Sequence, residues 1–185
     1  MSTYFSSVIK QLEYYKGLAD KAILQVEADA QLNWQPDANS NSIAIIIKHM
    51  VGNMISRWTD FLTSDGEKPW RNRESEFEGG YESREKMLEH WEKGWKCVFD
   101  ALHALTEDDL EKIIYIRNEG HTVMEAIHRQ LAHYPYHVGQ IVYLARMLAG
   151  DSWRALSIPK GNSEAFNAEK FAQEKGRRHF TEDLK

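Results

Sequence analysis

Four long stretches of the sequence repeat apolar residues at the spacing of an amphipathic α-helix. They cover approximately residues 3–30, 42–63, 83–105 and 123–150. Each stretch would present one apolar face, and such a face must be buried against another element. The pattern therefore predicts an all-α fold in which four helices pack as a four-helix bundle.

The segments between and after these stretches lack the helical spacing of apolar residues. Residues 64–82 are polar and rich in glycine, and a loop of this length is often a lid or a docking segment. Residues 111–123 read as a small β-hairpin that precedes the last long helix. Beyond about residue 150 we expect a mostly irregular C-terminal tail, with a short helix at about 163–175. The length of 185 residues favours a single domain over residues 1–185.

The composition excludes several classes of protein. The formal net charge is −5, and the sequence has no basic face, so we expect no nucleic-acid partner. The longest apolar run, residues 43–47, is far too short for a membrane span, and the N-terminus has no signal-peptide pattern. Cys97 is the single cysteine and lies at an apolar helical position, which favours a buried structural thiol. These features predict a cytoplasmic protein without membrane contact.

Two histidines four residues apart, His133 and His137, lie in the last apolar stretch, and His49 lies in the second. Side chains at positions i and i+4 share one face of a helix, so one helix can offer both imidazoles to a single ion. A third imidazole from a neighbouring helix would complete an open metal site. Hydrogen bonds to carbonyl groups or tyrosines are the alternative, since buried imidazoles need partners.

Pro135 lies between the two histidines and leaves two outcomes open. It removes one N–H from the helix ladder, so it either ends the helix and splits the pair or bends the helix locally and aims the imidazoles. The residues between His133 and His137 include no glutamate, whereas zinc proteases with an HExxH motif take their general base from that position. The sequence therefore argues against a protease of that kind.

Other polar residues carry weaker signals. The remaining histidines are expected to be surface or capping residues: His90, His103, His121, His128 and His179. Three arginines are candidate anchors for an acidic cosubstrate, although a solvated surface position is the simpler interpretation: Arg57, Arg71 and Arg73.

Three long motifs carry a resemblance to a known family. They are SNSIAIIIKHMVGNMISRWTDFLTSDGEKPWRNRESEFE, HTVMEAIHRQLAHYPYHVGQIVYLAR and SWRALSIPKGNSEAFN. Together they resemble the DinB/YfiT-like superfamily of small bacterial proteins, and more closely an uncharacterised subfamily of it. The resemblance spans residues of about 32–167.

The resemblance implies a four-helix bundle of the up-down-down-up type, often a homodimer, that binds a divalent metal, typically zinc or nickel. By motif position the ligands are His49, His133 and His137. Some members of the superfamily are S-transferases that use a low-molecular-weight thiol such as bacillithiol, and others are described as metal-dependent hydrolases. Three hypotheses follow: a metal-dependent thiol S-transferase acting on an electrophilic substrate, a metal-dependent hydrolase, or a non-enzymatic stress-response or interaction protein with a structural metal.

Overall fold

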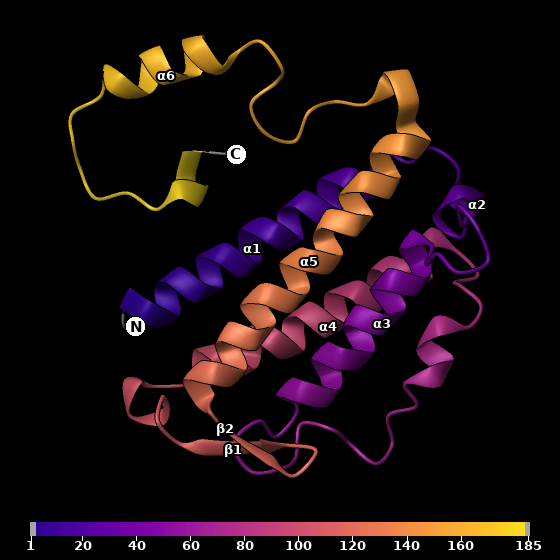
Figure 1. Cartoon of the computed structure of the whole chain (residues 1–185), viewed down its shortest axis with the longest axis vertical. Helices are drawn as coiled ribbons and strands as arrows, with labels where there is room; N and C mark the ends of the chain where they lie inside the picture. Colours follow the sequence, from indigo (N-terminus) through magenta and orange to yellow (C-terminus); the bar gives the residue numbers. More distant parts are fainter. Residues whose placement is uncertain (1–2, 184–185) are drawn as a thin grey trace.

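The computed structural model describes residues 3–183, which are mostly helical (Figure 1). Four long α-helices are α1 (Thr3–Ile23), α3 (Ile43–Trp58), α4 (Arg84–Ala104) and α5 (Val123–Ala149). The short helices are α2 (Asp29–Leu32) and α6 (Ser163–Phe171), and the strands are β1 (Ile113–Ile116) and β2 (Glu119–Thr122). Single 3-10 turns occur at Glu74–Phe77, Glu107–Asp109, Gly150–Ser152 and Phe180–Asp183.

The long helices pack against one another in pairs. Helix α1 lies along α5 and α3 lies along α4, while α3 also contacts α5 and α1 also contacts α4. The apolar faces predicted from the sequence meet between them and form the core. Trp91 and Trp95 of α4 are fully buried there, and Tyr134 of α5 packs edge-on to Trp95. Burial of these large side chains supplies much of the apolar area that stabilises the packing.

Local signals explain most helix ends. The Ser42 side chain accepts a hydrogen bond from the backbone N–H of Ile45 and so caps α3, and Thr122 with Glu125 forms the predicted capping box of α5. The predicted first helix was too long, because α1 ends at Ile23, where the Arg84 guanidinium donates to the Ile23 carbonyl at 2.9 Å.

The second helix was also predicted too long, since α3 ends at Trp58 rather than near residue 63. The backbone is extended at Thr59, and the next residue, Asp60, has a positive φ of 48°. A non-glycine residue in this left-handed region cannot continue a right-handed helix. The chain therefore leaves the helix early and enters the loop over residues 59–82 with a sharp change of direction.

The predicted hairpin is confirmed and packs on that loop. Strands β1 and β2 pair antiparallel, and the two turn residues Arg117 and Asn118 both have positive φ, as a two-residue hairpin turn requires. Both of their backbone N–H groups donate to the Asp65 carboxylate at 2.9 Å. The backbone N–H of Gly66 donates to the Tyr115 carbonyl at 2.8 Å, so the hairpin fixes the shape of the loop.

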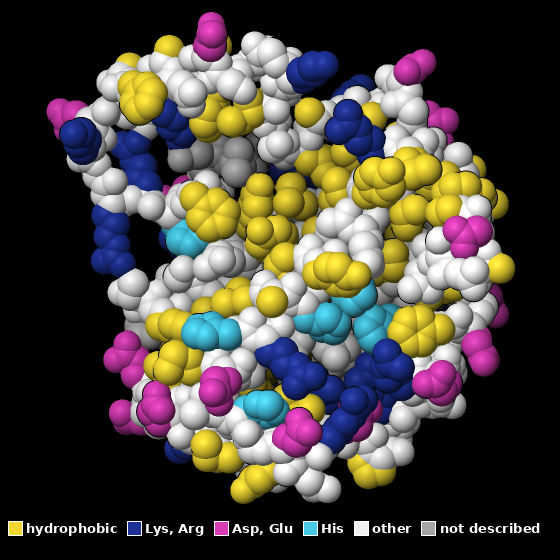
Figure 2. Space-filling model, viewed as in Figure 1, with side chains coloured by type: hydrophobic (Ala, Val, Ile, Leu, Met, Phe, Trp, Pro, Cys, Tyr) yellow, Lys and Arg dark blue, Asp and Glu magenta, His cyan; other side chains and the backbone are white. Residues whose placement is uncertain are grey.

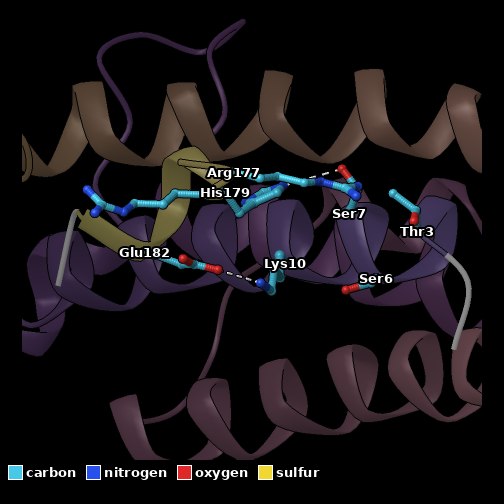
Figure 3. A pocket seen from close by; sticks show the side chains of 8 residues that line it. Thr3, Ser6, Ser7, Lys10, Arg177, His179 and Glu182 are labelled. Carbon is cyan, nitrogen blue, oxygen red and sulfur yellow. Dashed lines mark hydrogen bonds and ion pairs between the residues drawn. The ribbon is translucent and has the colours of Figure 1, made fainter. Parts of the chain in front are cut away.

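The C-terminal tail returns to α1 after α6 (Figure 1). Near its end His179 is hydrogen-bonded to Ser7 at 3.3 Å and Glu182 pairs with Lys10 at 2.6 Å (Figure 3). These contacts border an open cavity of about 380 Å³ beside the first turns of α1. Among residues 3–183, no helix is both long enough and apolar enough to cross a bilayer.

Candidate metal centre

Three histidines from two helices meet at one place in the structure. His49 comes from α3, and His133 and His137 come from α5, and one ligand nitrogen from each lies within 4.8 Å of the other two. His49 is buried, whereas the other two are partly exposed. Figure 2 shows histidine side chains grouped on one face, with Lys and Arg side chains beside them. The three histidines therefore lie close enough to hold a metal ion that solvent can reach.

Helix α5 continues through Pro135, which decides between the two outcomes left open by the sequence. Its helical residues run from Val123 to Ala149 with the proline inside. The pair of histidines consequently stays on one face, with ring centres 4.7 Å apart. The ring of His49 lies 5.0 Å from that of His137, so α3 brings the third imidazole to the same point.

Each of the three imidazoles has its Nδ1 atom next to a side-chain oxygen that accepts a hydrogen bond. The pairs are His49 with Glu76 Oε2 at 2.9 Å, His133 with Gln130 Oε1 at 3.2 Å, and His137 with Gln140 Oε1 at 2.9 Å. Because carboxylate and amide oxygens only accept, each Nδ1 carries the proton. In a neutral imidazole the Nε2 atom is then a lone-pair donor, which is the form that binds metals.

The Nε2 atoms of His133 and His137 face each other at 3.1 Å. With both protons on Nδ1, two lone pairs would repel at this distance unless a positive charge lies between them. Two bonds of about 2.1 Å to a tetrahedral zinc ion place their nitrogens about 3.4 Å apart, close to the observed separation. The arrangement of donors therefore fits a shared divalent cation.

The environment of His133 and His137 favours the neutral form of both imidazoles. Burial, followed by the neighbouring charges of His137 and His49, lowers the pKa of His133 to about 3. Burial likewise lowers the pKa of His137. Metal binding requires unprotonated imidazole, so protons compete weakly for these two nitrogen ligands at neutral pH.

Glu76 holds the imidazole of the buried His49 from the loop over residues 59–82. Its carboxylate accepts from His49 and also from Arg71, whose Nε and Nη2 atoms lie 2.7 and 3.0 Å from its two oxygens. Burial acts to raise the pKa of Glu76, but the hydrogen bonds from His49 and Arg71 hold it below the ordinary value. Gly52 makes room for this group, because a Cβ atom there would lie 2.2 Å from Glu76 Oε1.

Comparison with known proteins identifies the family but no activity. The model of a family described as "Protein of unknown function (DUF1572)" matches residues 1–162. The chain belongs to the DUF1572 family. No curated protein and no solved structure matches it. The matched region of this DUF1572 protein contains all three histidines and Glu76, and it ends just before α6.

The structure corrects the sequence interpretation of two arginines in this DUF1572 protein. The side chains of Arg57 and Arg71 are buried, with 6% and 3% exposed, and are not solvated surface groups. Both donate to the Glu67 carboxylate, and Arg71 also binds Glu76, so neither is free to anchor a cosubstrate. Arg73 is about half exposed and lies over the Phe77 ring.

The other histidines of the DUF1572 protein lie apart from the group or have other partners: His90 with Tyr81, His128 with Tyr4, and His179 with Ser7. The residues that accept hydrogen bonds from the three Nδ1 atoms were not predicted from the sequence. Gln130 and Gln140 lie three positions before His133 and three after His137, a helical spacing that predicts contact. Glu76 has no such spacing relative to His49.

Replacing Glu76 with glutamine should weaken zinc affinity by about 10–100-fold, because the imidazole of His49 loses the carboxylate that orients it and raises its basicity. Competition with a chromophoric chelator measures the affinity. Glu74→Gln is the matched control, since this neighbouring side chain is 86% exposed and pairs loosely with Arg73. Equal affinities for the two variants would contradict a role of Glu76 in metal binding.

Proposed function

We propose that this protein is a divalent-metal-binding enzyme of the DinB-like four-helix-bundle type, in which His49, His133 and His137 hold zinc or nickel. We further propose that it transfers a low-molecular-weight thiol to an electrophilic substrate. The main support is the convergence of three imidazoles whose Nδ1 atoms are each held by an acceptor. The resemblance to DinB-like S-transferases points to the same chemistry.

The exposure of the ligands favours a catalytic over a structural metal. Structural zinc sites are closed by four protein ligands, whereas catalytic sites keep a position for water or substrate. Within residues 3–183 the group comprises three ligands, and His133 and His137 are reached by solvent. A bound ion would therefore keep at least one position for a substrate group.

Within residues 3–183 the carboxylate that contacts these ligands, that of Glu76, is already paired with Arg71, which favours a thiol as the activated group. A bound divalent ion would supply Lewis acidity, which lowers the pKa of a coordinated thiol or water. Glu76 is already engaged by Arg71 and His49, so it is poorly placed to remove a proton from a substrate. A thiol has a pKa of about 8.5, against about 15.7 for water, and so needs far less help to ionise.

Hydrolysis is the second candidate. Three neutral imidazoles with an open position are also the ligand set of carbonic anhydrase, a zinc enzyme that activates water. The two candidates differ in one requirement, because a hydrolase would turn over an activated ester without added thiol.

Purified protein reconstituted with zinc or nickel should retain one equivalent of metal after dialysis, measured by mass spectrometry of the metal. The loaded protein should accelerate the conjugation of bacillithiol to monobromobimane, whereas the metal-free protein should not. Retention of less than about a tenth of an equivalent would contradict the metal site. Hydrolysis of p-nitrophenyl acetate without thiol would favour the hydrolase.

A further inference from the structure

The arginines next to the metal centre are mostly neutralised by carboxylates of the same region. Three guanidinium groups share a single oxygen, Glu67 Oε2: Arg57 at 3.1 Å, Arg71 at 3.3 Å and Arg117 at 3.2 Å. Glu76 pairs with Arg71. Burial acts to raise the pKa of Asp65, but backbone hydrogen bonds and the positive charge of Arg57 lower it below the ordinary value. These three arginines are thus balanced by three carboxylates.

Arg129 is the exception. It is exposed, and within residues 3–183 it makes no ion pair or hydrogen bond. It lies one helical turn before His133 on α5, so the two side chains share a face about 6 Å apart at their Cβ atoms. Residues 129, 133 and 137 follow one another at intervals of four, so Arg129 continues along α5 the row formed by the two histidines.

With a divalent ion bound, the centre would therefore carry a net positive charge. The three proposed ligands are imidazoles, which bring no negative charge, and the nearby Glu76 carboxylate is paired with Arg71, so a bound divalent ion and Arg129 would add their charges. Figure 2 shows Lys and Arg side chains directly beside the grouped histidines on this face. Such a concentration of positive charge attracts anions and speeds their encounter with the site.

We propose that the molecule bound at this site carries an oxyanion, a carboxylate or a phosphate, which Arg129 holds while the reacting group lies at the open metal position. This inference rests on the proposed metal-dependent function. A guanidinium suits the role because its planar N–H groups bind both oxyanions in a bidentate manner. His133 and His137 are partly exposed and Arg129 is exposed, so solvent reaches both histidines and the guanidinium.

Calorimetric titration of zinc-loaded protein with inorganic phosphate, and separately with succinate, tests this proposal. We expect at least one anion to bind, and Arg129→Gln to weaken that binding about tenfold or more, as expected for loss of a charged hydrogen bond. Arg146→Gln is the matched control, since Arg146 is also exposed on α5 but lies beyond His137 near the other end of the helix. It should change the affinity by less than about twofold. The tighter of the two anions identifies the class of oxyanion.

Zinc content, measured on the same samples, separates the two proposals. With a full equivalent of zinc, failure of both anions to bind, or equal affinities for the Arg129 and Arg146 variants, would overturn the role of Arg129 and leave the metal site intact. Protein that holds no zinc but binds an anion through Arg129 would overturn the metal proposal instead. Because Arg129 is exposed, neither substitution should disturb folding, and circular dichroism checks this point.

Discussion

His137→Ala should abolish stoichiometric zinc binding. If three or four ligands share a binding free energy of about 10–16 kcal/mol, the loss of one costs roughly 3–4 kcal/mol, or about two to three orders of magnitude in affinity. The variant should still fold, because His137 is partly exposed and Pro135 leaves α5 continuous on both sides. Chelator competition measures the affinity, and circular dichroism follows the helix content.

His103→Ala provides the control for this experiment. His103 is exposed on α4 and has no part in the histidine group, so its loss should leave zinc affinity unchanged. Wild-type zinc affinity in the His137 variant would show that the three imidazoles do not act together on one ion.

Gly52→Ala should damage both stability and metal binding, although it replaces the poorest helix former except proline with the best one. The new methyl group would lie 2.2 Å from Glu76 Oε1 and 2.6 Å from its Cδ, and would expel the carboxylate. Arg71 would then be left buried without this partner, and His49 without its acceptor. Breaking a buried ion pair costs about 3–5 kcal/mol and the gain in helix propensity is about 1 kcal/mol, so we expect a net loss of about 2–4 kcal/mol.

Gly17→Ala is the matched control for this change. Gly17 also lies within a long helix, α1, and a Cβ atom there would meet nothing within 4 Å. It should stabilise the protein by about 0.5–1 kcal/mol through helix propensity alone. Urea unfolding of both variants measures the difference. An unchanged unfolding free energy and zinc affinity in Gly52→Ala would show that the carboxylate moves aside without cost.

The helices and the pair of His133 and His137 could be predicted because both depend on regular spacing. Apolar periodicity marked the long helices, and the i,i+4 relation placed His133 and His137 on one face. The role of Pro135 could not be predicted, because a proline within a helical pattern is compatible with a break or with a kink. The position of His49 opposite this pair depends on how α3 packs against α5, which spacing within one helix does not specify.

The contact of Glu76 with His49 could not be predicted from residue spacing, because Glu76 belongs to a loop whose path depends on contacts with distant residues. One signal was nevertheless present in the sequence. Gly52 interrupts a strongly apolar helical stretch three residues after His49, and an isolated glycine in such a pattern often marks the close approach of another group. The structure identifies that group as the Glu76 carboxylate.

The contact between Asp65 and the hairpin turn has a consequence for the order of assembly during synthesis. The loop that supplies Arg71 and Glu76 is held by backbone groups of Arg117 and Asn118, which leave the ribosome about fifty residues later. Because domains are completed from the N-terminus as the chain emerges, His49 is made early but acquires its oriented form late. Helix α5 follows the hairpin directly, so His49 can meet His133 and His137 only after the groups that hold the loop have been made.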